Sequence, residues 1–249
     1  MLTALAAAVF LAAAPGEPAF LAVVDPGHGG EQAGARSPDG VCEKDVALAI
    51  AEKLAARLRR QGGRVILTRT GDITVRLADR AALAVAERAD LFISIHLNSM
   101  ATRRRRARTQ GVETYFLSAD ASDASATAVA ARENADRLAG EPEPDPNDPV
   151  AGILRDLQST EALVGSSRLA YAVHDRLVKA CHAEDRGVKQ APFYVLAGAS
   201  MPAILVEVGF ISHPQESRRL RSTAYQDRVA KAIADAVGYW RANGRQAMR

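Results

Sequence analysis

Two histidines and a glutamate stand at positions where an α/β protein would bind a ligand. His28 lies in VVDPGHGG, directly after a short apolar run, and His96 lies in SIHLNS, at the end of another. Glu43 lies in GVCEKDVALAI, just before an amphipathic segment, so the loop from His28 could fold back toward it. Two imidazoles and one carboxylate, with a fourth position open to water, form a usual ligand set for catalytic zinc. These residues indicate a zinc site with hydrolytic chemistry.

A second carboxylate lies within an apolar run. Glu207 occupies AILVEVGF, where an unpaired charge would be costly unless a cation or a functional use compensates it. Each residue also has an ordinary explanation. A histidine at a strand end is often a hydrogen-bonded core residue, Glu43 could complement a helix dipole, and Glu207 could pair with an arginine such as Arg69. From the residues alone, a zinc hydrolase and a purely structural role both stay open.

The elements that must position these side chains alternate between strands and helices. Short apolar runs predict six strands, at FLAVVD, RVILTR, LFISI, GVETYFL, FYVL and AILVEV. Helical spacing of apolar residues predicts helices over 46–60, 76–89, 122–139, 166–180 and 225–240, with ILRDLQS also helical. This alternation predicts one α/β domain with a mostly parallel six-stranded sheet and helices on both faces. Ligands of such sheets bind at the carboxyl ends of the strands.

Composition is that of a globular protein. The 249 residues are 48% hydrophobic and 24% charged, which excludes a disordered, collagen-like or polytopic membrane protein. A net charge of +3 gives no indication of nucleic acid binding. Two cysteines, Cys42 and Cys181, exclude a disulfide-rich scaffold and a four-cysteine zinc module. Any metal must therefore be held by histidines and carboxylates, and whether the cysteines pair stays open.

The amino terminus is typical of an export signal. MLTALAAAVFLAAA is apolar, uncharged and too short to span a bilayer, so residues 1–19 are predicted to be a leader and 20–249 the catalytic domain. Because the stretch lacks a basic n-region, a buried helix is the alternative. No later run reaches about 18 apolar residues, so we expect a periplasmic or otherwise exported protein without stable membrane insertion.

Six stretches occur in a characteristic order: VVDPGHGG, EKDVALAIAEKLAARL, ILTRTGD, ADLFISIHLNS, RGVKQAPFYVL and MPAILVEVGFISHPQE. Together they resemble the zinc-dependent N-acetylmuramoyl-L-alanine amidases of the amidase-3 type, which split peptidoglycan. The resemblance runs from Val23 to about Trp240 and implies a twisted sheet flanked by helices. It further implies zinc held by His28, Glu43 and His96, with Glu207 as the catalytic carboxylate.

The implied reaction is hydrolysis of the amide bond between N-acetylmuramic acid and L-alanine. Glu207 would accept the proton of the attacking water and pass it to the leaving nitrogen. Two alternatives are a non-catalytic wall-binding module of the same fold and a different zinc hydrolase, such as a peptidase or deacetylase. The presence of all four site residues speaks against the first alternative.

A long insertion separates GVETYFL from FYVL. About seventy residues intervene, including ARENADRLAG and the proline-rich, acidic segment GEPEPDPNDP. This resembles the regulated, division-associated subgroup, in which an inserted helix covers the active site until an activator protein displaces it. The resemblance implies a regulatory insertion at about 120–166 and a role in wall remodelling and daughter-cell separation. Within DLQSTEA, Glu161 is the expected autoinhibitory zinc ligand, and an exposed helical acid is the alternative.

One further motif is strongly basic. Residues 103–108, RRRRAR, contain five arginines in six positions and follow His96 in a loop. Such a run is usually a solvated loop, but beside the cleft it could steer the carboxylates of peptidoglycan stems. Nucleic acid is not an expected partner, because no aromatic platform accompanies the run.

Overall fold

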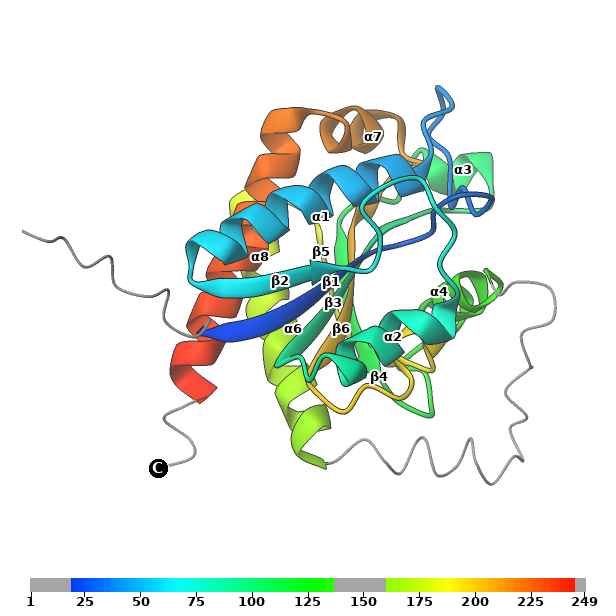
Figure 1. Cartoon of the computed structure of the whole chain (residues 1–249). Coiled ribbons are helices and arrows are strands. Elements are labelled where there is room, and N and C mark those ends of the chain that lie inside the picture. The colour runs from blue at the N-terminus through cyan, green and yellow to red at the C-terminus, as the bar shows by residue number, and fades with distance from the viewer. Residues whose placement is uncertain (1–18, 137–159, 245–249) are drawn as a thin grey trace, which may run out of the picture.

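A single six-stranded sheet organises the chain, of which the computed structural model describes residues 19–136 and 160–244 (Figure 1). Its strands are β1 (Phe20–Pro26), β2 (Gly63–Leu67), β3 (Leu91–Asn98), β4 (Val112–Leu117), β5 (Asp185–Ala191) and β6 (Ala203–Phe210). Their order in the sheet is β2-β1-β3-β6-β4-β5. Every neighbouring pair is parallel except β4 with β6, which is antiparallel. The prediction of one mostly parallel α/β sheet is confirmed.

Helices cover both faces of this sheet (Figure 1). One face carries α1 (Glu43–Arg60), α6 (Thr160–Cys181) and α8 (Thr223–Gly244), and the other carries α2 (Leu77–Ala86) and α4 (Ala124–Asn134). The short helices α3 (Arg103–Arg106) and α7 (Pro214–Leu220) lie in loops. Successive residues of a strand point to opposite faces of the sheet. Ala22 and Val24 therefore pack in the core beneath α1, α6 and α8, the first core, and Leu21 and Val23 pack in the core beneath α2 and α4, the second core. Two apolar cores therefore hold the sheet between helical layers.

The predicted fifth strand is wrong. FYVL forms a short 3₁₀ turn, Tyr194–Leu196, while the strand is the preceding polar segment, Asp185–Ala191. β5 is an edge strand whose residues are mostly half-buried, so it shows no apolar run. Phe193, Val195 and Leu196 are apolar because the turn packs into the second core. The hydrophobicity of FYVL correctly indicated that the segment is buried, but it did not indicate that the segment forms a turn and not a strand.

Several other expectations are decided by the fold. His174 of α6 is buried between the hydroxyl of Thr114 at 3.3 Å and the carboxylate of Asp185 at 2.8 Å. Its imidazole is therefore satisfied by partners on β4 and β5. Cys42 and Cys181 are free thiols.

The leader, ILRDLQS and the proline-rich segment lie outside the described residues. In the described part of the chain, no helix combines the length and apolarity needed to cross a membrane.

Candidate active site

The parallel strands β1 and β3 bring two histidines together. His96 lies within β3 near its carboxyl end, and His28 follows the paired end of β1, where Pro26 is in register with Ile95. A side chain at Gly27 would lie 2.5 Å from the His96 ring, so only glycine lets the loop pass. His28 itself has a positive φ of 59°, which turns its ring back toward His96. The ring centroids are 4.8 Å apart.

Glu43 joins the two histidines from the first residue of α1. Its Oε1 lies 3.0 Å from His28 Nε2 and 3.2 Å from His96 Nδ1. The backbone N–H groups of Leu97 and Ala35 each donate to this carboxylate at 2.8 Å, which fixes its orientation. The chain thus unites the three ligands expected from the sequence in one buried group.

A fourth residue of this group, Glu133, was not identified from the sequence. Its Oε2 lies 2.9 Å from His96 Nδ1 and 3.4 Å from His28 Nε2, and its side chain is buried. The ligand atoms of the four residues all lie within 4.8 Å of one another. A signal was present: Ala126, Val129, Ala130 and Glu133 share one buried face of α4, so a carboxylate extends an otherwise apolar stripe.

Glu161 is not part of this group. It is exposed in the first turn of α6 and lines a groove with Met201 and Tyr239. That groove also includes Ala19 and Asp90, which directly precede β1 and β3, so it lies at the amino ends of the strands. Of the two carboxylates in the expected insertion, Glu133 of α4 therefore lies with the candidate ligands and Glu161 does not.

Glu207 lies beside the ligands on β6, where it is paired in register with His96. Its partner is Arg132, whose Nη2 lies 3.3 Å from Glu207 Oε1 and 2.8 Å from Glu133 Oε1. Arg69, the partner considered from the sequence, instead donates to the carbonyls of Pro26 and Gly27. Glu207 is fully buried, so its carboxylate faces the site without competing solvent.

The acidic and basic groups shift one another's pKa. Burial by itself lowers the pKa of His96, but the Glu133 and Glu43 carboxylates outweigh it and raise the pKa to about 9. Burial raises the pKa of Glu133, but His96 outweighs burial and brings the value to about 2. Burial and the Glu133 carboxylate raise the pKa of Glu207 well above its ordinary value, against the effect of Arg132.

These residues fit a divalent metal ion. His28 Nε2, His96 Nδ1 and Glu133 Oε2 are buried and make no hydrogen bond within the described residues, although they converge on one point. Such polar atoms are costly unless a cation or proton satisfies them. Two imidazoles and carboxylates are suitable ligands for zinc. The remaining imidazole nitrogen of His28, Nδ1, lies 2.5 Å from Asp136 Oδ2, an arrangement that orients ligating histidines.

Comparison with known proteins identifies the family of the chain. Residues 22–239 match the family described as N-acetylmuramoyl-L-alanine amidase. The amidase AmiA of Salmonella typhimurium is 37% identical over 219 residues, which cover 87% of this chain and 74% of AmiA. A crystal structure of the amidase from Clostridium difficile 630 matches with a TM-score of 0.69 and 31% identity, covering 90% of this chain and 97% of that one.

A second solved structure gives the same result. The amidase AmiC2 of Nostoc punctiforme matches with a TM-score of 0.67 and 30% identity, over 89% of this chain and 96% of its own. Fold and sequence thus agree with this family over residues 22–239. The chain belongs to the N-acetylmuramoyl-L-alanine amidase family of peptidoglycan hydrolases.

Proposed function

We propose that this amidase is zinc-dependent and that it cleaves the bond between N-acetylmuramic acid and L-alanine. His28, Glu43 and His96 would hold the zinc. The observation that carries the proposal is the convergence of buried ligand atoms without hydrogen bonds next to Glu207. When bound, zinc supplies a Lewis acid and a water of lowered pKa.

Glu207 is the proton carrier in this proposal. Its carboxylate would accept a proton from the attacking water and return it to the leaving alanine nitrogen. Burial suits this role because it raises the pKa of Glu207, so the group holds the accepted proton readily. Arg132, 3.3 Å from Glu207 Oε1, limits that rise and fixes the carboxylate in place.

We propose further that Glu133 keeps the resting enzyme weak. Its Oε2 lies within 3.4 Å of a ring nitrogen of each histidine, where it would occupy space that the attacking water needs. A small cavity lined by His28, His96 and Glu133 adjoins the ligands. An activator protein that binds the displaced state of α4 more tightly would open the site. Such restraint suits wall cleavage confined to daughter-cell separation by an enzyme exported to the periplasm or cell envelope.

Product analysis tests the reaction. Purified peptidoglycan incubated with the enzyme should release stem peptides with a free L-alanine amine, with loss on chelation and recovery on adding zinc. A peptidase would release fragments with other amino termini, and a deacetylase would release acetate. A wall-binding module would release nothing, and any one of these three results would refute the proposed reaction.

Paired variants test the restraint. Glu133→Ala should raise hydrolysis without any partner, because it removes a carboxylate that crowds the ligands while leaving His28, Glu43 and His96 in place. Glu161→Ala is the matched control, since Glu161 is an exposed acid outside the group, and its activity should equal that of the parent. Activation by Glu161→Ala alone, in folded proteins with equal zinc content, would transfer the regulatory role to Glu161.

A further inference from the structure

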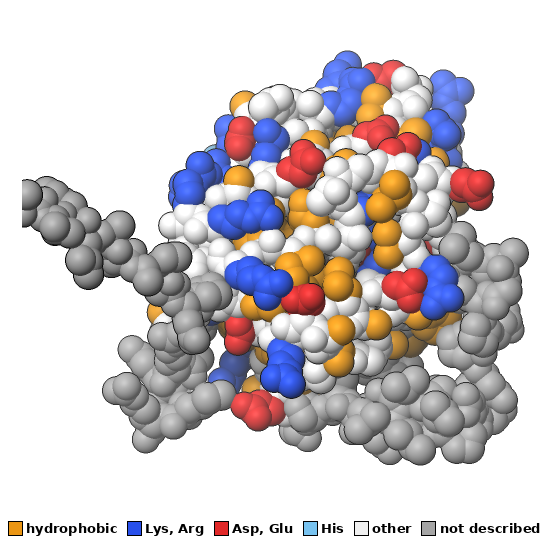
Figure 2. Space-filling view, viewed as in Figure 1, with side chains coloured by type: hydrophobic (Ala, Val, Ile, Leu, Met, Phe, Trp, Pro, Cys, Tyr) orange, Lys and Arg blue, Asp and Glu red, His pale blue; other side chains and the backbone are white. Residues whose placement is uncertain are grey.

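Among the residues that the structure describes, the turn formed by the basic run has no acidic partners that account for its charge. Arg103, Arg104, Arg105, Arg106 and Arg108 are all exposed. Within the described ranges 19–136 and 160–244, no carboxylate forms an ion pair with any of them, and the one side-chain hydrogen bond is from Arg106 Nε to the carbonyl of Met100. Elsewhere on the visible face, basic side chains are interspersed with acidic ones (Figure 2).

The turn is nevertheless held in a defined conformation. Thr102 caps α3 by accepting from the N–H of Arg105, and the backbone N–H of Arg106 donates to the carbonyl of Thr102. The loop is anchored at both ends, because Met100 N donates to the Ser212 hydroxyl at 3.0 Å and Gly111 N donates to the Glu216 carboxylate at 3.1 Å. Like charges repel across such a turn. A fixed turn of unpaired like charges is well suited to an anionic ligand.

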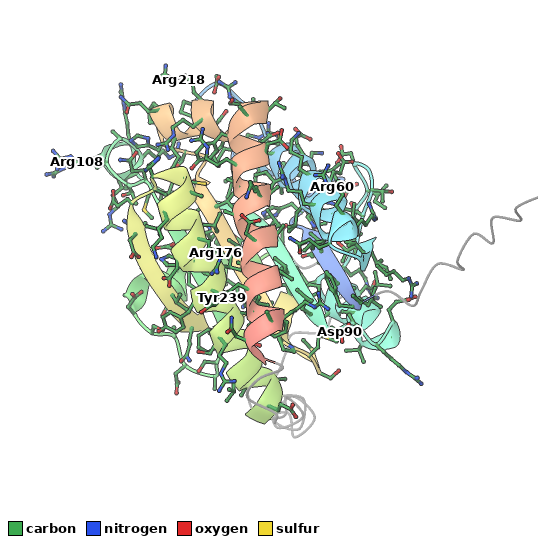
Figure 3. All side chains as sticks on the ribbon, turned by 90° about the vertical axis from the view of Figure 1, so that its left-hand side faces the viewer. Arg60, Asp90, Arg108, Arg176, Arg218 and Tyr239 are labelled. Atoms are coloured by element: carbon green, nitrogen blue, oxygen red, sulfur yellow. The ribbon has the colours of Figure 1, made fainter. Side chains whose placement is uncertain are left out.

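Its position connects the turn to the active site. Arg132, which contacts Glu207, also donates to the carbonyl of Ser99, directly after the end of β3. From there the chain enters α3, and Arg108 projects outward from the body of the protein (Figure 3). The arginines therefore extend from the rim of the site.

Geometry indicates what kind of anion would bind. Four consecutive residues of a helical turn point around its whole circumference, so the guanidinium groups cannot converge on one small ligand. They can contact several separated carboxylates of a polymer. A membrane-binding segment would add large apolar side chains, and residues 101–110, ATRRRRARTQ, contain none.

We infer that the arginine turn binds the stem-peptide carboxylates of polymeric peptidoglycan and gives the enzyme a preference for intact wall over small soluble fragments. This inference rests on the proposed function, from which it takes the substrate. Multiple weak contacts along one polymer produce this preference, because each contact after the first is effectively intramolecular.

Sedimentation with purified wall sacculi measures this binding apart from turnover. In a Glu207→Gln background, the triple change Arg104→Gln, Arg105→Gln and Arg108→Gln should weaken the apparent Kd at low salt by about tenfold, as expected from three partly exposed charge pairs. Arg106 is retained because of its bond to Met100. The difference should vanish at high salt, where such contacts are screened.

A control triple variant matches the change in net charge. Arg60, Arg168 and Arg228 are exposed on α1, α6 and α8, and Arg60 lies on the opposite side from Arg108 in Figure 3. Their change to glutamine should leave the Kd within about twofold, because none of these residues belongs to the turn. Sacculi whose stem carboxylates have been converted to amides should bind parent and turn variant equally.

Two results would overturn the inference. One is equal retention of the turn variant and the control variant on untreated sacculi. The other is loss of binding by the turn variant to vesicles of anionic phospholipid while binding to sacculi is unchanged, which would assign the turn to a membrane surface. Because sedimentation requires no cleavage, neither result depends on whether the proposed reaction is correct.

Discussion

A buried ion pair supports the loop that carries His28. Arg80 of α2 is 1% exposed, and its Nη1 lies 2.7 Å from Asp25 Oδ1 at the end of β1. The same guanidinium donates to the carbonyls of Pro26 and His28 at 3.0 and 2.9 Å. We predict that Arg80→Met, which keeps most of the side-chain volume, destabilises the protein strongly and loosens the His28 loop.

The expected loss follows from what the substitution leaves behind. Asp25 is fully buried and would keep its hydrogen bonds from Ser94 and Thr68 but lose its counter-charge. Leaving a buried charge unpaired costs about 3–5 kcal/mol. For a domain of this size, that corresponds to a fall in Tm of roughly 6–20 °C. It is also a large share of the roughly 5–15 kcal/mol that stabilises a typical protein.

Urea unfolding with matched variants provides the assay. Arg64→Met is the control, because Arg64 also pairs with a carboxylate, that of Glu87 at 2.9 Å, but both side chains are solvent-accessible. Its cost should stay below about 1 kcal/mol. Adding Asp25→Asn to Arg80→Met should recover part of the loss, since the buried charge is then gone. Zinc content of the purified variants reports the effect on the loop.

The same pair predicts a dependence on pH. Burial alone would raise the pKa of Asp25, but Arg80 and the Ser94 and Thr68 hydroxyls lower it below its ordinary value. A lowered carboxyl pKa stabilises the folded state above the unfolded value of about 3.9, and this stabilisation is lost as the pH falls through the folded value. Without Arg80, burial raises the pKa instead. The free-energy difference between parent and Arg80→Met should therefore shrink between neutral pH and about pH 4.

Either of two outcomes would refute this reasoning. A cost below about 1 kcal/mol for Arg80→Met, equal to that of Arg64→Met, would mean that the buried charge is accommodated without its partner. A double variant whose loss equals the sum of the two single losses would mean that Asp25 and Arg80 do not interact energetically.

Three further predictions concern the site itself. Glu207→Gln should keep zinc but lose at least about 100-fold in the rate of stem-peptide release, and a near-normal rate would remove Glu207 from the mechanism. His28→Ala and His96→Ala should each lose both metal and activity, and elemental analysis showing one tightly held zinc per chain would exclude that residue as a ligand. Asp136→Asn should weaken zinc binding by about 10- to 100-fold in chelator competition, whereas unchanged affinity would show that its contact with His28 Nδ1 does not orient the ring.

Local patterns predicted five of the six strands and the edge of the sheet that carries the candidate site. The runs containing Val24, Ile93 and Leu205 are continuous and apolar because central parallel strands are buried on both faces. The position of β5 was not predicted, because an edge strand that is only half-buried needs no continuous apolar run. Its Lys189 instead pairs with the buried Glu113 on β4 at 3.1 Å, a contact visible only across strands.

The motifs of the sequence, through the family that they resemble, predicted that His28, Glu43, His96 and Glu207 belong to one site, and the fold places these residues side by side. Each lies at or near the end of a strongly patterned element, and parallel strands bring such ends to one edge of the sheet. The motifs around these residues also determined the family, which the comparisons confirm.

Only the tertiary structure decided which carboxylate of the inserted region reaches the ligands. Glu133 and Glu161 are both acidic residues on helices. The residues next to them in the sequence do not indicate which of the two helices covers the carboxyl edge of the sheet. The packing of Ala126, Val129 and Ala130 into the second core places α4 there and turns Glu133 inward, whereas α6 begins with Glu161 exposed at the opposite edge. Local sequence sets the conformation of a helix, but its docking depends on apolar contacts between residues far apart in the chain.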